Sequence, residues 1–147
     1  MGLDRALNIN VSGIEAQRQA MELIASNLAN VNTTRTVYGG AYRRRIPIFS
    51  EKGLVSFEDE LQIAENRLAS SGGGGVEVAE IVEDNAPFPK VYRPGHPDAD
   101  AEGFLSLPNV NLATEMVDMT YAQRIHEANI TAFNATKKMM QDTLQLQ

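Results

Sequence analysis

Apolar residues recur at helical spacing at both ends of the chain, and this pattern predicts two long helices. Such a stripe is typical of a helix that packs against another helix. Two ends devoted to helix packing favour a protein that associates over one that catalyses. Over about residues 3–32 the stripe consists of Leu7, Ile14, Met21, Ile24, Leu28 and Val31, and after residue 111 it consists of Leu112, Met116, Met119, Ile130, Phe133, Met140 and Leu144.

Residues at the helix ends refine the two predictions. Asn27, Asn30 and Asn32 crowd the end of the first helix, and asparagine favours caps over helix interiors, so this helix is expected to stop near Val31. Gly13 costs about 1 kcal/mol relative to alanine and could fray or kink the helix. Asn111 is a candidate N-cap for the second helix.

The segment between the helices is rich in glycine and proline and predicts short strands and loops. Strands are predicted at 45–49, where Pro47 restricts the strand to an edge, at 76–82 by alternation, and at 90–92. Gly39-Gly40 marks a turn, residues 58–69 are ambiguous, and residues 70–75 are expected to form a flexible linker or the tip of a loop. We predict an α+β fold, with long N- and C-terminal helices packed as a coiled-coil-like domain (1–32 and 108–147) and a small β-rich middle domain (33–107).

Composition narrows the function further. The 147 residues include no cysteine, which excludes disulfides and thiolate metal sites, and the net charge of −6 disfavours general nucleic-acid binding. No run approaches the roughly 20 apolar residues of a membrane span, and no signal-peptide pattern is visible after Met1. A cytosolic protein is the simple expectation, although an export route without cleavage would leave the same pattern.

Charge is distributed unevenly along the middle segment. Residues 33–52 carry five basic residues against one acidic residue, whereas 53–88 carry eight acidic residues against one basic residue. These blocks could pair with each other or between copies of the chain. For Arg43-Arg44-Arg45 we expect a solvated strand edge or ion pairs between subunits, because no aromatic stacking platform for nucleic acid accompanies them beyond Tyr38 and Tyr42.

Candidate chemistry is sparse. His96, Asp98 and Asp100 could serve as ligands of a divalent ion, but Pro94-Gly95-His96-Pro97-Asp98 is also a stiff turn sequence, and the turn is favoured. His126 lies on the C-terminal stripe and is expected to be packed and hydrogen-bonded. No nucleophile motif or phosphate loop is present, so we expect no enzyme, no cofactor and no metal.

An ordered set of short motifs carries a family resemblance. The segment Ser26-Asn27-Leu28-Ala29-Asn30-Val31-Asn32-Thr33 resembles the sequence that closes the N-terminal helix of flagellar axial proteins, the rod, hook and hook-associated families. The remaining motifs resemble the proximal-rod branch of the flagellar basal-body rod proteins. They are residues 42–44, 91–100, 103–104, 108–111, 115–119, 127–129 and 133–134. The chain departs from the wider family at 34–40, and 72–75 and the acidic stretch before it match no family motif.

This resemblance implies a structural subunit of the flagellar rod in the periplasm, which transmits motor torque toward the hook. It implies export by the flagellar type III apparatus, and as partners copies of the same chain and other rod proteins, with no nucleic acid and no membrane span. The terminal helices would form the inner tube domain. The expected assembly interface is Leu7, Ile14, Met21, Ile24, Asn27, Leu28, Asn30, Val31, Met116, Met119, Ile130, Phe133, Met140 and Leu144, and the expected family turn is Pro94, Gly95, His96, Pro97, Asp98 and Asp100.

Two other functions stay open, a cytosolic coiled-coil adaptor and a small metal- or nucleic-acid-binding module. The apolar stripes look too thin to offset the entropy of ordering two long helices. We therefore expect the terminal helices to be poorly ordered in the monomer and to become rigid when neighbouring subunits cover them.

Overall fold

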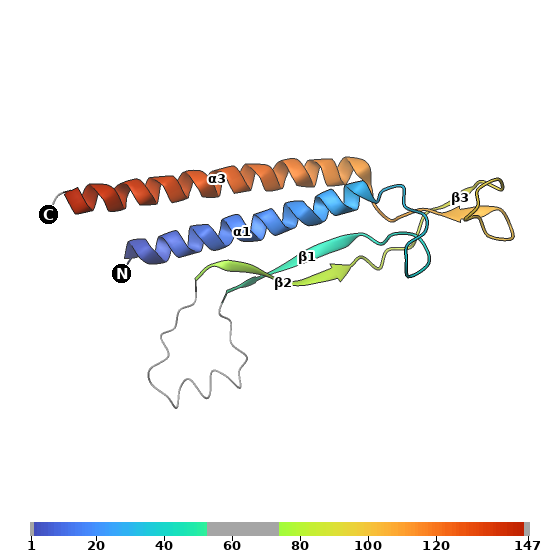
Figure 1. The fold of residues 1–147 in the computed structure, drawn as a ribbon, viewed down its shortest axis with the longest axis horizontal. Coiled ribbons are helices and arrows are strands. Elements are labelled where there is room, and N and C mark those ends of the chain that lie inside the picture. The colour runs from blue at the N-terminus through green and yellow to red at the C-terminus, as the bar shows by residue number, and fades with distance from the viewer. Residues whose placement is uncertain (1, 53–73, 146–147) are drawn as a thin grey trace, which may run out of the picture.

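Two long helices and two short antiparallel hairpins make up the described part of the fold (Figure 1). The computed structural model describes residues 2–52 and 74–145. The predicted α+β class is confirmed, whereas the predicted domain boundaries stay predictions, and the ambiguous stretch 58–69 lies outside the described residues. In chain order the elements are α1 (Gly2–Ala29), β1 (Arg45–Glu51), β2 (Val76–Glu83), β3 (Lys90–Tyr92), β4 (Phe104–Ser106) and α3 (Leu112–Gln145).

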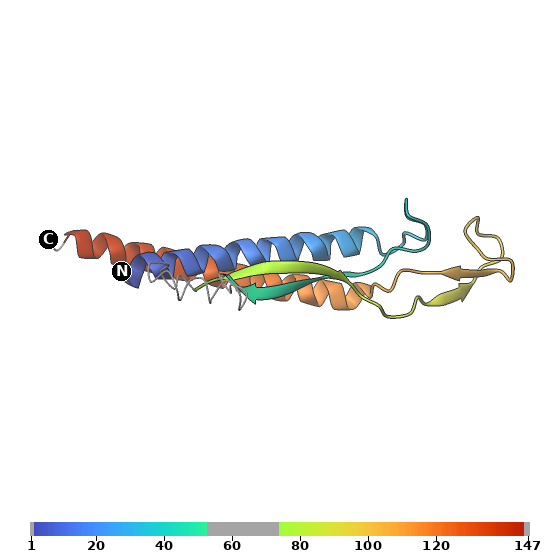
Figure 2. The same ribbon diagram turned by 90° about the horizontal axis from the view of Figure 1, so that it is seen from below.

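Helices α1 and α3 lie side by side and run antiparallel (Figures 1 and 2). They contain 28 and 34 residues, or about 42 and 51 Å of helix. Both predicted helices are confirmed, although α1 ends at Ala29 rather than near Val31. The predicted N-cap is also confirmed, because Asn111 Oδ1 accepts the backbone N–H groups of Ala113 and Thr114 at 3.0 and 3.2 Å.

The buried side chains of the two helices are small or polar, and they are not the predicted apolar stripes. Ala16 and Ala20 are buried on α1. Gly13 does not interrupt α1, and a Cβ there would lie only 3.0 Å from Asn129 Nδ2 on α3, so glycine permits a close approach of the helices. On α3 the buried residues are spaced at seven-residue intervals or multiples of them: Glu115, Ala122 and Thr136.

The β1–β2 hairpin packs along α1 (Figure 2). Its register runs from Arg45 opposite Glu83 to Glu51 opposite Val76, with a bulge between Ile48 and Phe49. Pro47 lies within β1, and because the sheet has two strands, each strand has a free edge that tolerates the missing N–H. The predicted strands at 45–49 and 76–82 are confirmed and extend slightly further.

A close contact at Ser12 holds the start of β2 against α1. Ser12 Oγ donates to the carbonyl of Ile9 at 2.7 Å and accepts the N–H of Val76 at 3.0 Å. Gly75 has φ of +123°, and a Cβ at this position would lie 2.5 Å from Ser12 Oγ. Glycine is therefore required here both by the backbone conformation and by the lack of space.

The β3–β4 hairpin extends beyond the helix pair, at the end of the molecule opposite the two chain termini (Figure 1). The prediction at 90–92 is confirmed, whereas β4 was not predicted. The rings of Tyr92 and Phe104 meet edge to face across the hairpin at 5.5 Å between centroids. Leu105 is buried, with 1% of its surface exposed. These contacts keep the small hairpin in one register.

Large apolar side chains are rare in the interior of the described residues. Tyr42 and Leu105 are the two large residues of the buried apolar set, and the others are alanines: Ala16, Ala20, Ala41 and Ala122. Hydrophobic burial alone therefore holds the helices together weakly, and the polar contacts at their junction with β1 gain importance.

Candidate assembly interface

Asn27 lies at the centre of a buried polar junction between α1, β1 and α3. Its side chain is 1% exposed and uses its full hydrogen-bonding capacity. Asn27 Nδ2 donates to the carbonyl of Arg45 at 2.9 Å and to Glu115 Oε2 at 3.0 Å. Asn27 Oδ1 accepts the Tyr42 hydroxyl and the Arg45 N–H, both at 3.0 Å. One amide therefore joins residues 42–45 and α3 to α1.

Arg44 extends the junction to the surface of α3. Glu115 is fully buried, and its Oε1 accepts from Arg44 Nε at 2.5 Å. Arg44 Nη2 also binds Asp118 Oδ2, one turn along α3, at 3.1 Å. A buried carboxylate is tolerated only when it is paired and hydrogen-bonded, and Arg44 and Asn27 together satisfy both of its oxygens.

Asn109 connects the same junction to the segment after β2. Its Oδ1 accepts the N–H of Arg44 at 2.7 Å, and its Nδ2 donates to the carbonyl of Asp84 at 3.0 Å. The segment before β1, the segment after β2 and the segment before α3 therefore meet within one hydrogen-bonded network.

Asn30 and Thr33 close α1. Asn30 Nδ2 donates to the carbonyl of Ser26 at 2.9 Å, and Thr33 Oγ1 donates to Asn30 Oδ1 at 3.2 Å. The prediction of asparagine capping is confirmed for Asn30, whereas for Asn27 it is wrong, because Asn27 lies inside α1 and binds across to other elements. The family motif thus combines a helix end with a link between elements.

The expected family turn forms the loop between β3 and β4. Asp100 Oδ1 accepts the N–H groups of Glu102 and Phe104 at 3.0 and 2.8 Å, as expected of a turn residue. Asp98 Oδ2 accepts the Thr34 hydroxyl at 2.8 Å, and Arg35 lies 3.7 Å from its other oxygen. The carboxylates thus have internal partners, and the loop is held against the segment that follows α1.

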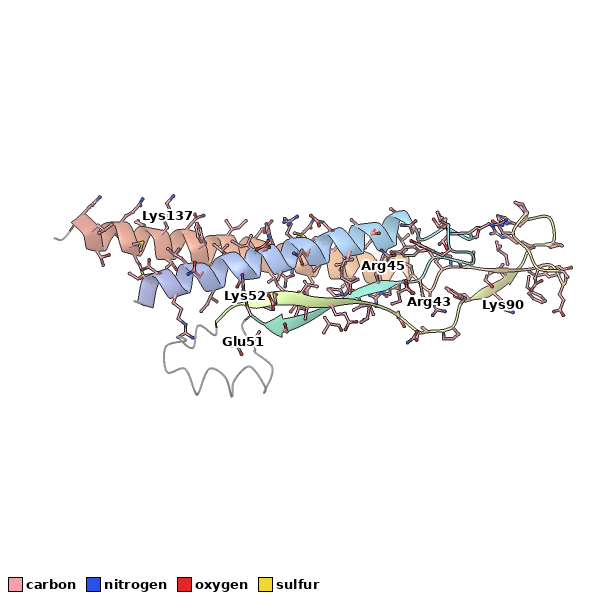
Figure 3. All side chains as sticks on the ribbon, turned by 60° about the horizontal axis from the view of Figure 1, so that its bottom comes forward. Arg43, Arg45, Glu51, Lys52, Lys90 and Lys137 are labelled. Atoms are coloured by element: carbon pink, nitrogen blue, oxygen red, sulfur yellow. The ribbon has the colours of Figure 1, made fainter. Side chains whose placement is uncertain are left out.

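The structure bears on two earlier interpretations of charged residues, the metal site and the solvated arginines. Within residues 2–52 and 74–145, no group of three His, Asp or Glu side chains could hold a metal ion. For Arg44 the expected solvated edge is wrong, because its side chain is 24% exposed and paired within the chain. Figure 3 shows Arg43 and Arg45 near the start of β1, where Arg43 donates to the Asp84 carbonyl at 3.1 Å and lies over the Phe88 ring.

His126 departs from expectation in one respect. It is half-buried on α3, as predicted, but its Nδ1 is buried and has no hydrogen-bond partner among the described residues. The expected hydrogen bond at this atom is therefore absent.

The expected interface residues fall into a covered set and an exposed set. Asn27 is fully buried. The apolar stripe residues that lie within α1 are half-buried, and so are Met119, Phe133 and Met140 on α3. Met116, Ile130 and Leu144 are exposed by 57, 39 and 68%. The α3 stripe thus lies beside the buried line of α3 rather than on it, and Lys137, which interrupts the stripe, is exposed (Figure 3). Contact of these residues with a neighbouring subunit stays a prediction.

Two further exposed apolar features were not predicted as interface. On the first turns of α3, Val117 and Tyr121 are 68 and 67% exposed next to Met116. In the loop after α1, Val37 and Tyr38 are 100 and 98% exposed. The sequence signal for the second feature was an apolar pair directly before Gly39-Gly40.

These observations define a class of protein: an elongated structural subunit with a polar, tightly specified junction and apolar side chains left on its surface. Neither helix in the described parts of the chain has the length and apolar content that a membrane span requires.

Comparison with known proteins identifies the family. A model of flagella basal body rod proteins matches residues 7–35, and a model of the C-terminal region of flagellar basal body rod FlgEFG proteins matches residues 101–146. The flagellar basal-body rod protein FlgC of Bacillus subtilis is 41% identical over 147 residues, covering 96% of this chain and 95% of the relative. FlgC of Borreliella burgdorferi is 41% identical over 98% of this chain and 97% of the relative, and FlgC of Aquifex aeolicus is 36% identical over 99% and 97%.

The chain therefore belongs to the family of flagellar basal-body rod proteins, on its FlgC branch. The resemblance read from its motifs is confirmed. It is a structural subunit of the flagellar basal body and not an enzyme.

Proposed function

We propose that this chain is a subunit of the proximal rod, which assembles helically with copies of itself and with other rod proteins in the periplasm. The assembled rod transmits torque from the motor toward the hook. Stiffness comes from many helix–helix contacts between subunits, and open helical growth requires contacts that do not close into a ring. The chain reaches the periplasm through the flagellar type III export apparatus.

The observation that carries this proposal is the distribution of apolar groups on α3. Leu112, Met116, Val117, Tyr121 and Leu144 are each more than half exposed along the helix, while its buried face is small and polar. Burying one such side chain fully is worth roughly 1.5–3 kcal/mol. Contacts with neighbours can therefore supply the hydrophobic burial that the interior of a single subunit lacks.

The long helix pair is suited to carry load along a shaft. An antiparallel helix pair about 50 Å long can lie along a tube and contact several neighbours at once. The network at Asn27 and Glu115 fixes the start of β1 to both helices, so that load applied to the β1–β2 hairpin reaches the helix pair.

A charge-insertion experiment tests the assembly. The double variant Ile130→Glu/Leu144→Glu places carboxylates on the exposed part of the predicted α3 stripe. The control Thr131→Glu/Ala135→Glu adds the same charge to the same helix at exposed positions on the side away from the stripe. We expect the stripe variant to abolish motility and rod completion in cells while the purified protein keeps its helicity, and the control to swim.

Motile cells carrying the stripe variant, with rods complete in cryo-EM of basal bodies, would contradict the assembly proposal. The export proposal has its own test. The chain is expected in the periplasmic fraction of cells with a working flagellar export apparatus and to be missing from that fraction when the export ATPase is inactive.

A further inference from the structure

A short turn after α1 presents two apolar side chains entirely to solvent. We call residues 36–40 the tip. Val37 is 100% exposed and Tyr38 is 98% exposed. The backbone is nevertheless fixed, because Thr36 N–H donates to the Gly40 carbonyl at 2.9 Å and Gly39 N–H donates to the Thr36 carbonyl at 3.0 Å. The Thr36 hydroxyl adds a third bond, to the Gly39 carbonyl at 3.2 Å.

The two glycines explain how so tight a turn can present this pair. Gly39 and Gly40 have φ of +87° and +76°, which a glycine adopts without steric cost. The tip is thus a preformed knob, and binding it requires little further ordering of the backbone.

A matching surface occurs on the first turns of α3. A shallow hollow of about 380 Å³ is lined by Met116, Val117, Thr120, Tyr121 and Arg124. We call it the α3 hollow. Three of its lining side chains are large, apolar or aromatic and more than half exposed.

The chemistry of the hollow suits the tip. Val37 can pack on Met116 and Val117, and the Tyr38 ring offers its face to the guanidinium of Arg124, a cation–π contact worth about 0.5–2 kcal/mol. The Tyr38 hydroxyl can bond Thr120 at the rim of the hollow, so that this hydroxyl keeps a hydrogen-bond partner when the ring is buried.

No residue of the tip lines the hollow of its own chain. Figure 2 shows the loop after α1 rising on one side of the helix pair and the first turns of α3 lying on the other side. A contact between the tip and the hollow therefore joins different surfaces of two copies, which makes it heterologous and open-ended.

We propose that the tip of one copy of this chain docks into the α3 hollow of the next copy. This inference rests on the proposed helical assembly and names one of its contacts. Val37 and Tyr38 enter the hollow beside Met116 and Val117, and repetition of the contact adds subunits in one direction.

Disulfide cross-linking tests the contact directly, because the chain contains no cysteine. Purified Tyr38→Cys is mixed with purified Thr120→Cys at concentrations where the wild type self-associates and is then mildly oxidised. We expect one cross-linked dimer from this mixture and a ladder of dimers, trimers and larger species from the double variant. Tyr38→Cys mixed with Gln141→Cys, an exposed site elsewhere on α3, is expected to give no product beyond those of each variant alone.

A second measurement separates the contact from the cross-linking chemistry. Tyr38→Ala should weaken self-association at least tenfold, while Tyr38→Phe should keep most of it because the ring is retained. Equal cross-linking to Gln141→Cys, a product only between two copies of Tyr38→Cys, or an internal bond in the double variant without a ladder would overturn the proposal. A cross-link in cells from the tip to a protein of another mass, instead of a second copy, would also overturn it. If the wild type assembles into rods but the tip cross-links to no hollow, this inference fails while the proposed function stands.

Discussion

Removing the Asn27 side chain should loosen the whole molecule, because this one amide joins α1 to residues 42–45 and to α3. Asn27→Ala deletes four hydrogen bonds, of which three are to neutral groups and one is to the Glu115 carboxylate. At about 1 kcal/mol for each neutral bond and about 1.5–3 kcal/mol for the bond to a charged group, the loss is about 4.5–6 kcal/mol. A typical domain has only about 5–15 kcal/mol of total stability.

Urea unfolding of the dilute chain, followed by circular dichroism at 222 nm, measures this loss. The matched control is Asn32→Ala, since Asn32 belongs to the same asparagine-rich segment but is exposed. We expect the control to change the free energy of unfolding by less than about 0.5 kcal/mol. Equal effects of Asn27→Ala and Asn32→Ala, both below about 1 kcal/mol, would refute the reasoning that the junction holds the elements together.

A substitution cycle checks which bond matters most. Asn27→Asp keeps the acceptor for Tyr42 and Arg45 but places a carboxylate against Glu115, so we expect it to destabilise at least as much as Asn27→Ala. Adding Glu115→Gln supplies a donor in the reverse direction and should recover about 1–2 kcal/mol. No recovery in the double variant would show that the contact between these two side chains carries little of the energy.

Three further outcomes follow from the structure. Gly75→Ala should cost about 2–4 kcal/mol in urea unfolding, because its Cβ would collide with Ser12 Oγ at a positive φ, whereas Gly95→Ala, with open space around it, should be neutral. Asp98→Ala removes the bond from Thr34 and should raise hydrogen exchange in the loops on both sides of that contact, with about 1 kcal/mol lost; unchanged exchange would contradict it. Circular dichroism of the dilute monomer should show less helix than α1 and α3 contain, rising on assembly; full helicity at low concentration would exclude ordering by neighbours.

The sequence was sufficient to predict both helices, three of the four strands and the cap at Asn111. These features depend on local patterns, namely apolar periodicity, alternation and the helix-end preference of asparagine. β3 and β4 have three residues each, too few alternating positions for a pattern to distinguish a strand from a loop. The prediction at 90–92 came from its proline-flanked, extended surroundings, and β4 was missed.

The role of Asn27 and Glu115 could not be predicted from the sequence, because their partners are distant in it. Asn27 and Glu115 are separated by 88 residues, and Asn27 and Arg45 by 18. A helix-end asparagine and a first-turn glutamate each have an adequate local explanation, as a cap and as a favourable charge near a helix N-terminus. Only the packing of α1 against α3 shows that they satisfy one another.

The apolar stripes do not coincide with the fully buried residues of the two helices, and the reason is physical. Periodicity shows that a helix has an apolar face but does not show what covers that face. In this chain the buried line of α3 is Glu115, Ala122 and Thr136, which allow close approach and hydrogen bonding, while exposed Met116 and Ile130 lie to one side. A chain that assembles must keep part of its apolar surface available, so periodicity alone cannot separate internal from external contacts.

A polar junction also fixes the register of the helices in a way that an apolar one would not. If α3 slid by one turn along α1, Glu115 would leave Asn27 and face Leu23 or Val31, and its buried charge would lose a partner at a cost of several kcal/mol. A slide between aliphatic stripes would exchange one apolar contact for another at little cost. Because each contact with a neighbour depends on where the exposed side chains of α3 stand relative to α1, a subunit that repeats along a shaft needs the same register in every copy. The buried amide and carboxylate provide this precision, and the exposed apolar groups provide the energy of association.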